Sequence, residues 1–174
     1  MRKLLDRTYL LAAWIAAFLI LAIACLVSAQ VVLNLLTRIT SLPLPSTIPS
    51  YADFSGFMLA AGTFLAMPYT FRSGGHIKVS LVTSRLPGRG ALWAEVSALV
   101  VALGLVAFAC VYIVALVYES WHFGDVSPGI IPIPLWLPQS FMALGMILLL
   151  VAICDTLVQT LRSGAPVIRN AEEV

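Results

Sequence analysis

Long apolar runs, separated by short polar or proline-rich segments, dominate the pattern along this chain. Four runs are long enough to cross a bilayer core of about 30 Å, which takes about 20 helical residues. They cover residues 9–37, 51–71, 92–118 and 131–161. None of the runs alternates apolar and polar residues with a period of two, so the pattern predicts helices rather than barrel strands.

The four runs leave no room for a separate soluble domain. At about 1.5 Å per residue, a run of about 27 residues spans about 40 Å, so the longer helices must tilt or project beyond the hydrocarbon. We therefore expect an all-α integral membrane fold, one domain of four long tilted transmembrane helices. Several prolines precede the fourth helix, which should start near Pro138 or a few residues earlier.

Composition supports this membrane assignment. Of the 174 residues, 61% are apolar and 10% are charged, against about 45–50% and about 25% in soluble domains. These values exclude a soluble enzyme domain, a disordered linker and a nucleic-acid-binding module. The cysteines stand singly inside apolar runs, as expected of packing residues: Cys25, Cys110 and Cys154.

The basic residues predict the orientation. With four spans, both termini and the loop at residues 72–91 share one side, which carries nine of the ten basic residues: Arg2, Lys3, Arg7, Arg72, Lys78, Arg85, Arg89, Arg162 and Arg169. The other side has only Arg38. Because basic loops stay in the cytoplasm, we expect both termini to be cytoplasmic in a multi-pass inner-membrane protein. The first apolar run exceeds a signal-peptide core of about 7–15 residues, so we expect it to be retained as a span.

Helix ends and small residues give local expectations. Ser50 and Asp53 have the spacing of a capping box at the start of the second helix. Small residues at helical spacing allow close helix approach, within the chain or against another subunit: Ala52, Gly56 and Ala60. Aromatic residues near span ends are typical of interfacial anchors: Tyr9, Trp14, Tyr51, Tyr69, Trp93, Tyr118, Trp121 and Trp136.

Two acidic residues, Glu95 and Asp155, lie inside the spans near the expected cytoplasmic interface. Ionisable groups within a membrane need a partner or mark a function. We expect ion pairs between helix ends, with partners drawn from Arg72, Lys78, Arg89 or Arg162. A proton relay is the alternative, but no acid or base at the membrane centre continues such a path.

A second polar group follows the third span. Glu119, His122 and Asp125 are spaced so that a helix would bring them near one face. Three readings are open: a polar rim at the interface, a docking site for an outside partner, and a metal site. The helix is expected to end close to Gly124, which favours the rim over the metal site.

The segment at residues 72–87 is the most distinctive. Gly74 and Gly75 can end the second helix in a left-handed cap. The residues after them suggest a short amphipathic helix at the membrane interface, with Lys78 and Arg85 toward lipid headgroups. The alternative is a basic turn that only sets topology.

This segment resembles the small membrane subunit of TRAP (tripartite ATP-independent periplasmic, DctQ-like) transporters. That family shows Arg at the end of the second helix, then Gly-His-Ile/Val, alternating basic and apolar residues, and Leu-Pro. The matching residues are Arg72, Gly75, His76, Ile77, Lys78, Val79, Leu81, Leu86 and Pro87. Ser80 stands where members often have an acid, which removes a local ion pair.

The resemblance implies a scaffold role without catalysis and without a cofactor of its own. It implies a large multi-span partner subunit that holds the substrate and sodium sites, and a periplasmic binding protein that captures an organic acid. The implied role of Arg72, Gly75, His76, Lys78, Arg85, Leu86 and Pro87 is assembly or lipid contact. Our own hypothesis is that the outer ends help to dock the binding protein, through Arg38, Glu119, His122 and Asp125.

The residues themselves agree on one point: the sequence has no internal repeat or pair of half-helices of the kind that builds a transport site. Two alternatives remain, the small subunit of a tricarboxylate-type tripartite transporter and a stand-alone membrane transporter or cofactor-bearing membrane subunit. Haem ligation is disfavoured because neither His76 nor His122 is placed mid-membrane.

Overall fold

The computed structural model describes residues 2–40, 45–74 and 88–164, and these form four helices. The helices are α1 (Arg2–Ile39), α2 (Tyr51–Arg72), α4 (Gly88–Phe123) and α5 (Trp136–Ser163). All four are long and apolar enough to cross a membrane. The all-α membrane fold with four spans is thereby confirmed, while the short amphipathic helix expected between the second and third spans lies outside the described residues.

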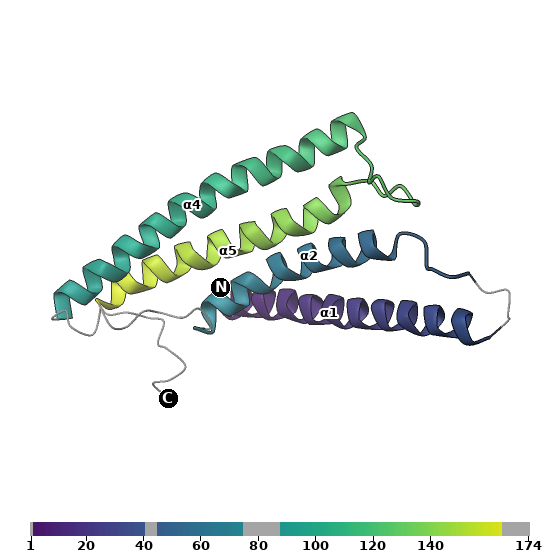
Figure 1. Cartoon of the computed structure of the whole chain (residues 1–174). Helices are drawn as coiled ribbons and strands as arrows, with labels where there is room; N and C mark the ends of the chain where they lie inside the picture. The colour runs from purple at the N-terminus through teal and green to yellow at the C-terminus, as the bar shows by residue number, and fades with distance from the viewer. Residues whose placement is uncertain (1, 41–44, 75–87, 165–174) are drawn as a thin grey trace.

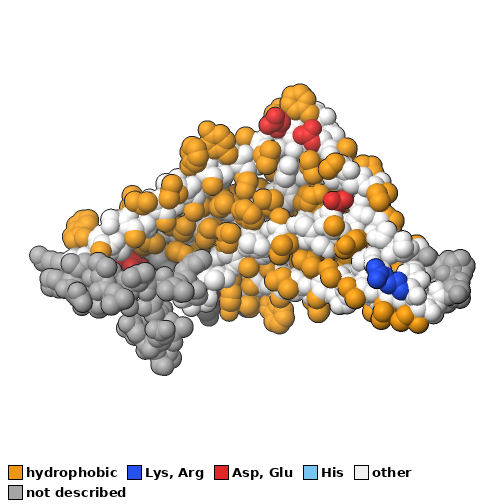
Figure 2. Space-filling model, viewed as in Figure 1, with side chains coloured by type: hydrophobic (Ala, Val, Ile, Leu, Met, Phe, Trp, Pro, Cys, Tyr) orange, Lys and Arg blue, Asp and Glu red, His pale blue; other side chains and the backbone are white. Residues whose placement is uncertain are grey.

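The helices lie side by side as an open layer (Figure 1). Contacts join α1 to α2, α2 to α5, and α5 to α4, so α1 and α4 form the two edges. The edge helices are the least covered: 11% and 6% of their most apolar stretches are buried, against 33% for α5. Apolar side chains therefore cover much of the visible face (Figure 2). We call the end where α1 begins and α5 ends the inner end, and the opposite end the outer end.

Small residues bring α1 and α2 together. Ala12 and Ala16 of α1 pack against Leu65 of α2, and all three are buried. Gly62 lies so close to α1 that an added Cβ would be 3.6 Å from the Ala16 carbonyl oxygen. The expected ridge is not the one used: Ala52 and Gly56 are exposed, so the close approach depends on the neighbouring face of α2.

The crossing of α2 and α5 depends on Gly145. A Cβ on this residue would overlap the carbonyl group of Phe64 and lie 2.9 Å from the Leu65 amide nitrogen. Pro68, buried inside α2, has no N–H, so it cannot donate to the carbonyl four residues earlier, that of Phe64. The backbone of α5 thus packs directly against the α2 carbonyl that proline leaves without its helical donor.

Larger side chains join α5 to α4. Leu149 and Ile153 of α5 form a buried cluster with Leu99 of α4. Met67 and Phe71 of α2 pack against this cluster from the other side. The cluster therefore lies where α5 is held between α2 and α4.

Candidate functional site

An ion-pair cluster joins three helices at the inner end. Arg72, the last residue of α2, lies 3.4 Å from the Asp155 carboxylate of α5 and 3.9 Å from the Asp6 carboxylate of α1. The same guanidinium donates a hydrogen bond to the Thr156 hydroxyl at 3.1 Å. We call these four residues the inner polar junction.

The polar groups of the junction are well matched. The Thr156 hydroxyl donates to the Ala152 carbonyl while it accepts from Arg72. The Gln159 amide donates to the Asp155 carboxylate at 2.6 Å. The Arg72 side chain is 16% exposed and that of Asp155 is 25% exposed. Since charges inside a bilayer must be paired or hydrated, the junction makes an arginine tolerable at this depth and ties α1 and α5 to α2.

Local sequence explains why Arg72 sits at a helix end. Ser73 takes the C-cap position of α2, and its amide donates to the Tyr69 carbonyl. Gly74 follows with φ of 74°, a conformation that glycine adopts readily. The helix therefore stops directly after Arg72, and the negative end of its dipole lies next to the guanidinium.

Tyr9 does not act as the interfacial anchor that its position suggested. It is 1% exposed, and its hydroxyl has no hydrogen-bond partner among the described residues. Other aromatic residues on that list do face outward, Trp14, Trp93 and Trp121 among them. The mistake arises because the run that follows Tyr9 is apolar on all sides, so spacing alone cannot tell the packed face from the lipid face.

The outer end is held by hydrogen bonds from side chains to loops. Gln30 of α1 is buried, and its carbonyl oxygen accepts from the Ile48 amide at 2.7 Å. The Ser50 hydroxyl accepts from the Ile131 amide at 2.9 Å, which links the loop before α2 to the loop before α5. Gly129 packs against the Asp53 carboxylate so closely that an added Cβ would overlap it.

This arrangement corrects the capping-box expectation. Ser50 does stand at the N-cap of α2, but with φ of 53° and with no side-chain capping hydrogen bond. Its hydroxyl is used by Ile131 instead. A tertiary partner therefore replaced the local one that the spacing had indicated.

The polar residues after the third span remain on the surface. Glu119, His122 and Asp125 are all exposed, and α4 ends at Phe123 between the last two. The His122 ring stacks on Tyr118 with centroids 5.9 Å apart. Among the described residues, no three His, Cys, Asp or Glu side chains are placed to hold a metal ion.

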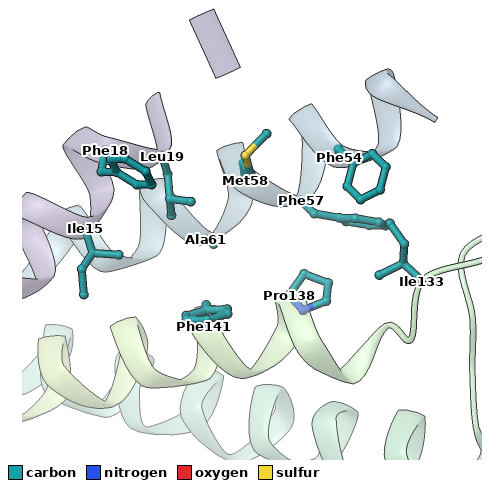
Figure 3. A pocket seen from close by; sticks show the side chains of 10 residues that line it. All are labelled: Ile15, Phe18, Leu19, Phe54, Phe57, Met58, Ala61, Ile133, Pro138 and Phe141. Carbon is teal, nitrogen blue, oxygen red and sulfur yellow. The ribbon is translucent and has the colours of Figure 1, made fainter. Parts of the chain in front are cut away.

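An apolar groove of about 380 Å³ opens between α1, α2 and α5 in the outer half of the layer. Figure 3 shows its aromatic and aliphatic side chains, with Ala61 on α2 and Pro138 on α5. Phe18, Phe54, Phe57 and Phe141 contribute most of its rings. Such a groove offers no polar chemistry for a charged substrate.

The remaining sequence candidates separate into two groups. Arg72 and Asp155 are brought together in the inner polar junction, and Glu95 lies half-buried near the start of α4. The other motif residues lie outside the described residues: Gly75, His76, Lys78, Arg85, Leu86 and Pro87. Sequence reasoning missed Asp6, whose position next to the N-terminal basic residues gave no sign of a contact with α2.

Comparison with known proteins gives one match. The family model for the DctQ component of tripartite ATP-independent periplasmic transporters matches residues 27–163. No match was found among curated proteins or among solved structures.

Proposed function

The chain belongs to the DctQ component family of tripartite ATP-independent periplasmic transporters, and from this premise we propose that it is the small membrane subunit that braces the large one during uptake. The family is one of transporter components, not of enzymes. The bracing role is our interpretation of how the helices are built and joined.

One observation carries this proposal: the charged groups inside the spans are used to hold helices together. Arg72 pairs with both Asp155 and Asp6 at the inner end. Each of the four described helices is continuous from its first to its last residue, without the broken half-helices that form ion and substrate sites in secondary transporters. Such a layer suits a rigid support for a moving partner.

We assign the remaining functions to other chains. The large multi-span subunit would hold the substrate and sodium sites, and a periplasmic binding protein would deliver an organic acid. Uptake would be driven by the sodium gradient, with no cofactor bound by the small subunit. Two observations support this division: the lining of the groove is apolar, and Arg72 of the junction is already paired with two carboxylates.

We place the subunit in the bacterial inner membrane with both termini in the cytoplasm. The nine-to-one division of basic residues supports this orientation. The motif residues from Arg72 to Pro87 would then lie on the cytoplasmic side, where we propose a role in assembly or lipid contact. Lys78 and Arg85 would meet anionic headgroups.

The outer end is our candidate for contact with the binding protein. Arg38 lies at the end of α1, whereas Glu119, His122 and Asp125 lie at the end of α4 or just after it. Because α1 and α4 are opposite edges of the layer (Figure 1), these residues form two separate patches and not one. A docking partner would have to span the layer to reach both.

Co-purification tests the assignment. A tagged form of this chain, produced together with the large subunit of its transporter, should retain that subunit through affinity and size-exclusion steps in mild detergent. As the control, a tagged unrelated four-span protein should not retain it. Recovery of this chain alone, under conditions where the large subunit is stable, would contradict the proposed function.

A further inference from the structure

Tyr9 is a buried polar side chain that the ion pairs of the inner polar junction do not account for. Its side chain is 1% exposed, and its hydroxyl has no hydrogen-bond partner among the described residues. A hydroxyl that leaves water without a new partner costs free energy, so buried hydroxyls are in most cases satisfied by a protein group or by an ordered water molecule. A partner for the Tyr9 hydroxyl is therefore expected close to it.

The position of Tyr9 places this hydroxyl beside the junction. Tyr9 shares one face of α1 with Ala12 and Ala16, which pack against α2. Of the charged groups that act on Tyr9, the Asp155 carboxylate of α5 acts most strongly, followed by Arg72 and Asp6. The tyrosine thus lies where α1 faces the ion pairs made by α2 and α5.

The Asp155 carboxylate has an oxygen atom available for a further hydrogen bond. Its contacts with Arg72 and Gln159 are both made by Oδ2, so Oδ1 keeps its lone pairs as acceptors. The Tyr9 hydroxyl is too far away for a direct hydrogen bond, although the charge of Asp155 acts on it. A single water molecule, with a hydrogen bond of about 2.8 Å on each side, joins oxygen atoms up to about 5.5 Å apart.

A second buried hydroxyl, that of Thr160, shows why Tyr9 is the informative one. Thr160 is fully buried, and its hydroxyl also has no partner among the described residues. A threonine in a helix can turn its hydroxyl toward the carbonyl four residues earlier, as Thr156 does toward Ala152. The Tyr9 hydroxyl stands at the end of a rigid ring and cannot reach its own helix in this way. It therefore needs a partner from outside α1.

We infer that an ordered water molecule binds between Tyr9 and Asp155. The tyrosine hydroxyl donates to the water, and the water donates to Asp155 Oδ1. This site links α1 to α5 across the end of α2, in addition to the link through Arg72. A bound water also suits a carboxylate inside a span, since charges at such depth are paired or hydrated. The inference concerns the chain itself and does not depend on which partner the chain supports.

Tyr9→Phe tests the site, because it removes the hydroxyl and keeps the ring. Loss of the water-mediated bond should lower the thermal unfolding temperature of the full-length chain in detergent by about 2–4 °C. Tyr112→Phe is the matched control, since Tyr112 is 62% exposed on α4, a helix outside the junction, and this change should have no effect. An experimental density map that resolves water should show one between Tyr9 and Asp155.

Two results would overturn the inference. The first is a Tyr9→Phe chain that is as stable as wild type or more stable, because removal of an unsatisfied hydroxyl relieves a cost and breaks no bond. The second is a map in which the Tyr9 hydroxyl contacts a protein group directly, with no water between it and Asp155. Neither measurement involves transport or the large subunit, so failure here leaves the proposed function to its own test.

Discussion

At the scale of single residues, the account depends on a few side chains that do more than fill space. Arg72 ends α2, pairs with carboxylates from two neighbouring helices and donates to Thr156. Gly145 permits α5 to touch the backbone of α2. Both effects are local, so single and double substitutions can test them.

Loss of the Arg72 charge should destabilise the chain through the carboxylates left behind. Arg72→Gln leaves Asp155 unpaired inside the span, and we expect a loss of about 2 kcal/mol, less than the about 3–5 kcal/mol of a fully buried pair. Adding Asp155→Asn should restore much of it. Thermal unfolding in detergent measures both; an Arg72→Gln chain as stable as wild type, or no recovery in the double variant, would contradict the junction.

Gly145→Ala should disturb the layer more than any other glycine-to-alanine change in a span. The added methyl would overlap the backbone of Phe64, which no rotamer change relieves, so we expect a loss of about 1–3 kcal/mol. Gly56→Ala is the matched control, since nothing lies within 4 Å of its Cβ position. That change should be neutral or slightly stabilising. Equal effects in both variants would argue against the close crossing.

At the scale of elements, hydropathy was enough to predict that four helices exist. A run of about 20 apolar residues that crosses a membrane must satisfy its backbone hydrogen bonds internally, and a helix does so. Hydropathy was not enough to predict their faces. α1 and α4 are apolar on nearly every side, so the burial of Tyr9 could not be foreseen. Ser50 was misassigned for a related reason, since a spacing of three residues cannot reveal a partner 81 residues away.

The Ser50 link can be tested with two substitutions. Ser50→Gly removes the acceptor of the Ile131 amide but suits φ of 53°. Ser50→Ala removes the same acceptor and keeps the strained backbone. We expect losses of about 1 kcal/mol for Gly and about 2 kcal/mol for Ala, measured by thermal unfolding. If neither variant is less stable than wild type, the hydrogen bond between Ser50 and Ile131 has no energetic role.

At the scale of the whole molecule, the order α1–α2–α5–α4 is the feature that the sequence could not reveal. Adjacent spans in sequence need not be neighbours: α2 and α4 are both neighbours of α5. The sequence predicted the Asp155 part of the inner polar junction, because an acid inside a span needs a basic partner. It did not predict the contact of Asp6, which lies among basic residues near the N-terminus. An open layer with two exposed edges is consistent with the proposed role as a support for the large subunit.

The proposed orientation gives a whole-molecule prediction. Green fluorescent protein fused after Val174 should fluoresce, and alkaline phosphatase fused after Gly124 should be active, because the first reporter works in the cytoplasm and the second only outside it. The basis is the excess of basic residues on one side. The reverse pattern, with an active phosphatase at Val174, would invert the orientation and remove the argument for cytoplasmic motif residues.

The central claim is that this chain supports transport and does not perform it. Uptake into proteoliposomes under a sodium gradient tests it most directly, with the small subunit, the large subunit and the binding protein added singly and together. We predict uptake of an organic acid only when all three are present, and none with the small subunit alone. Uptake by the small subunit alone, or full uptake in its absence, would contradict the account.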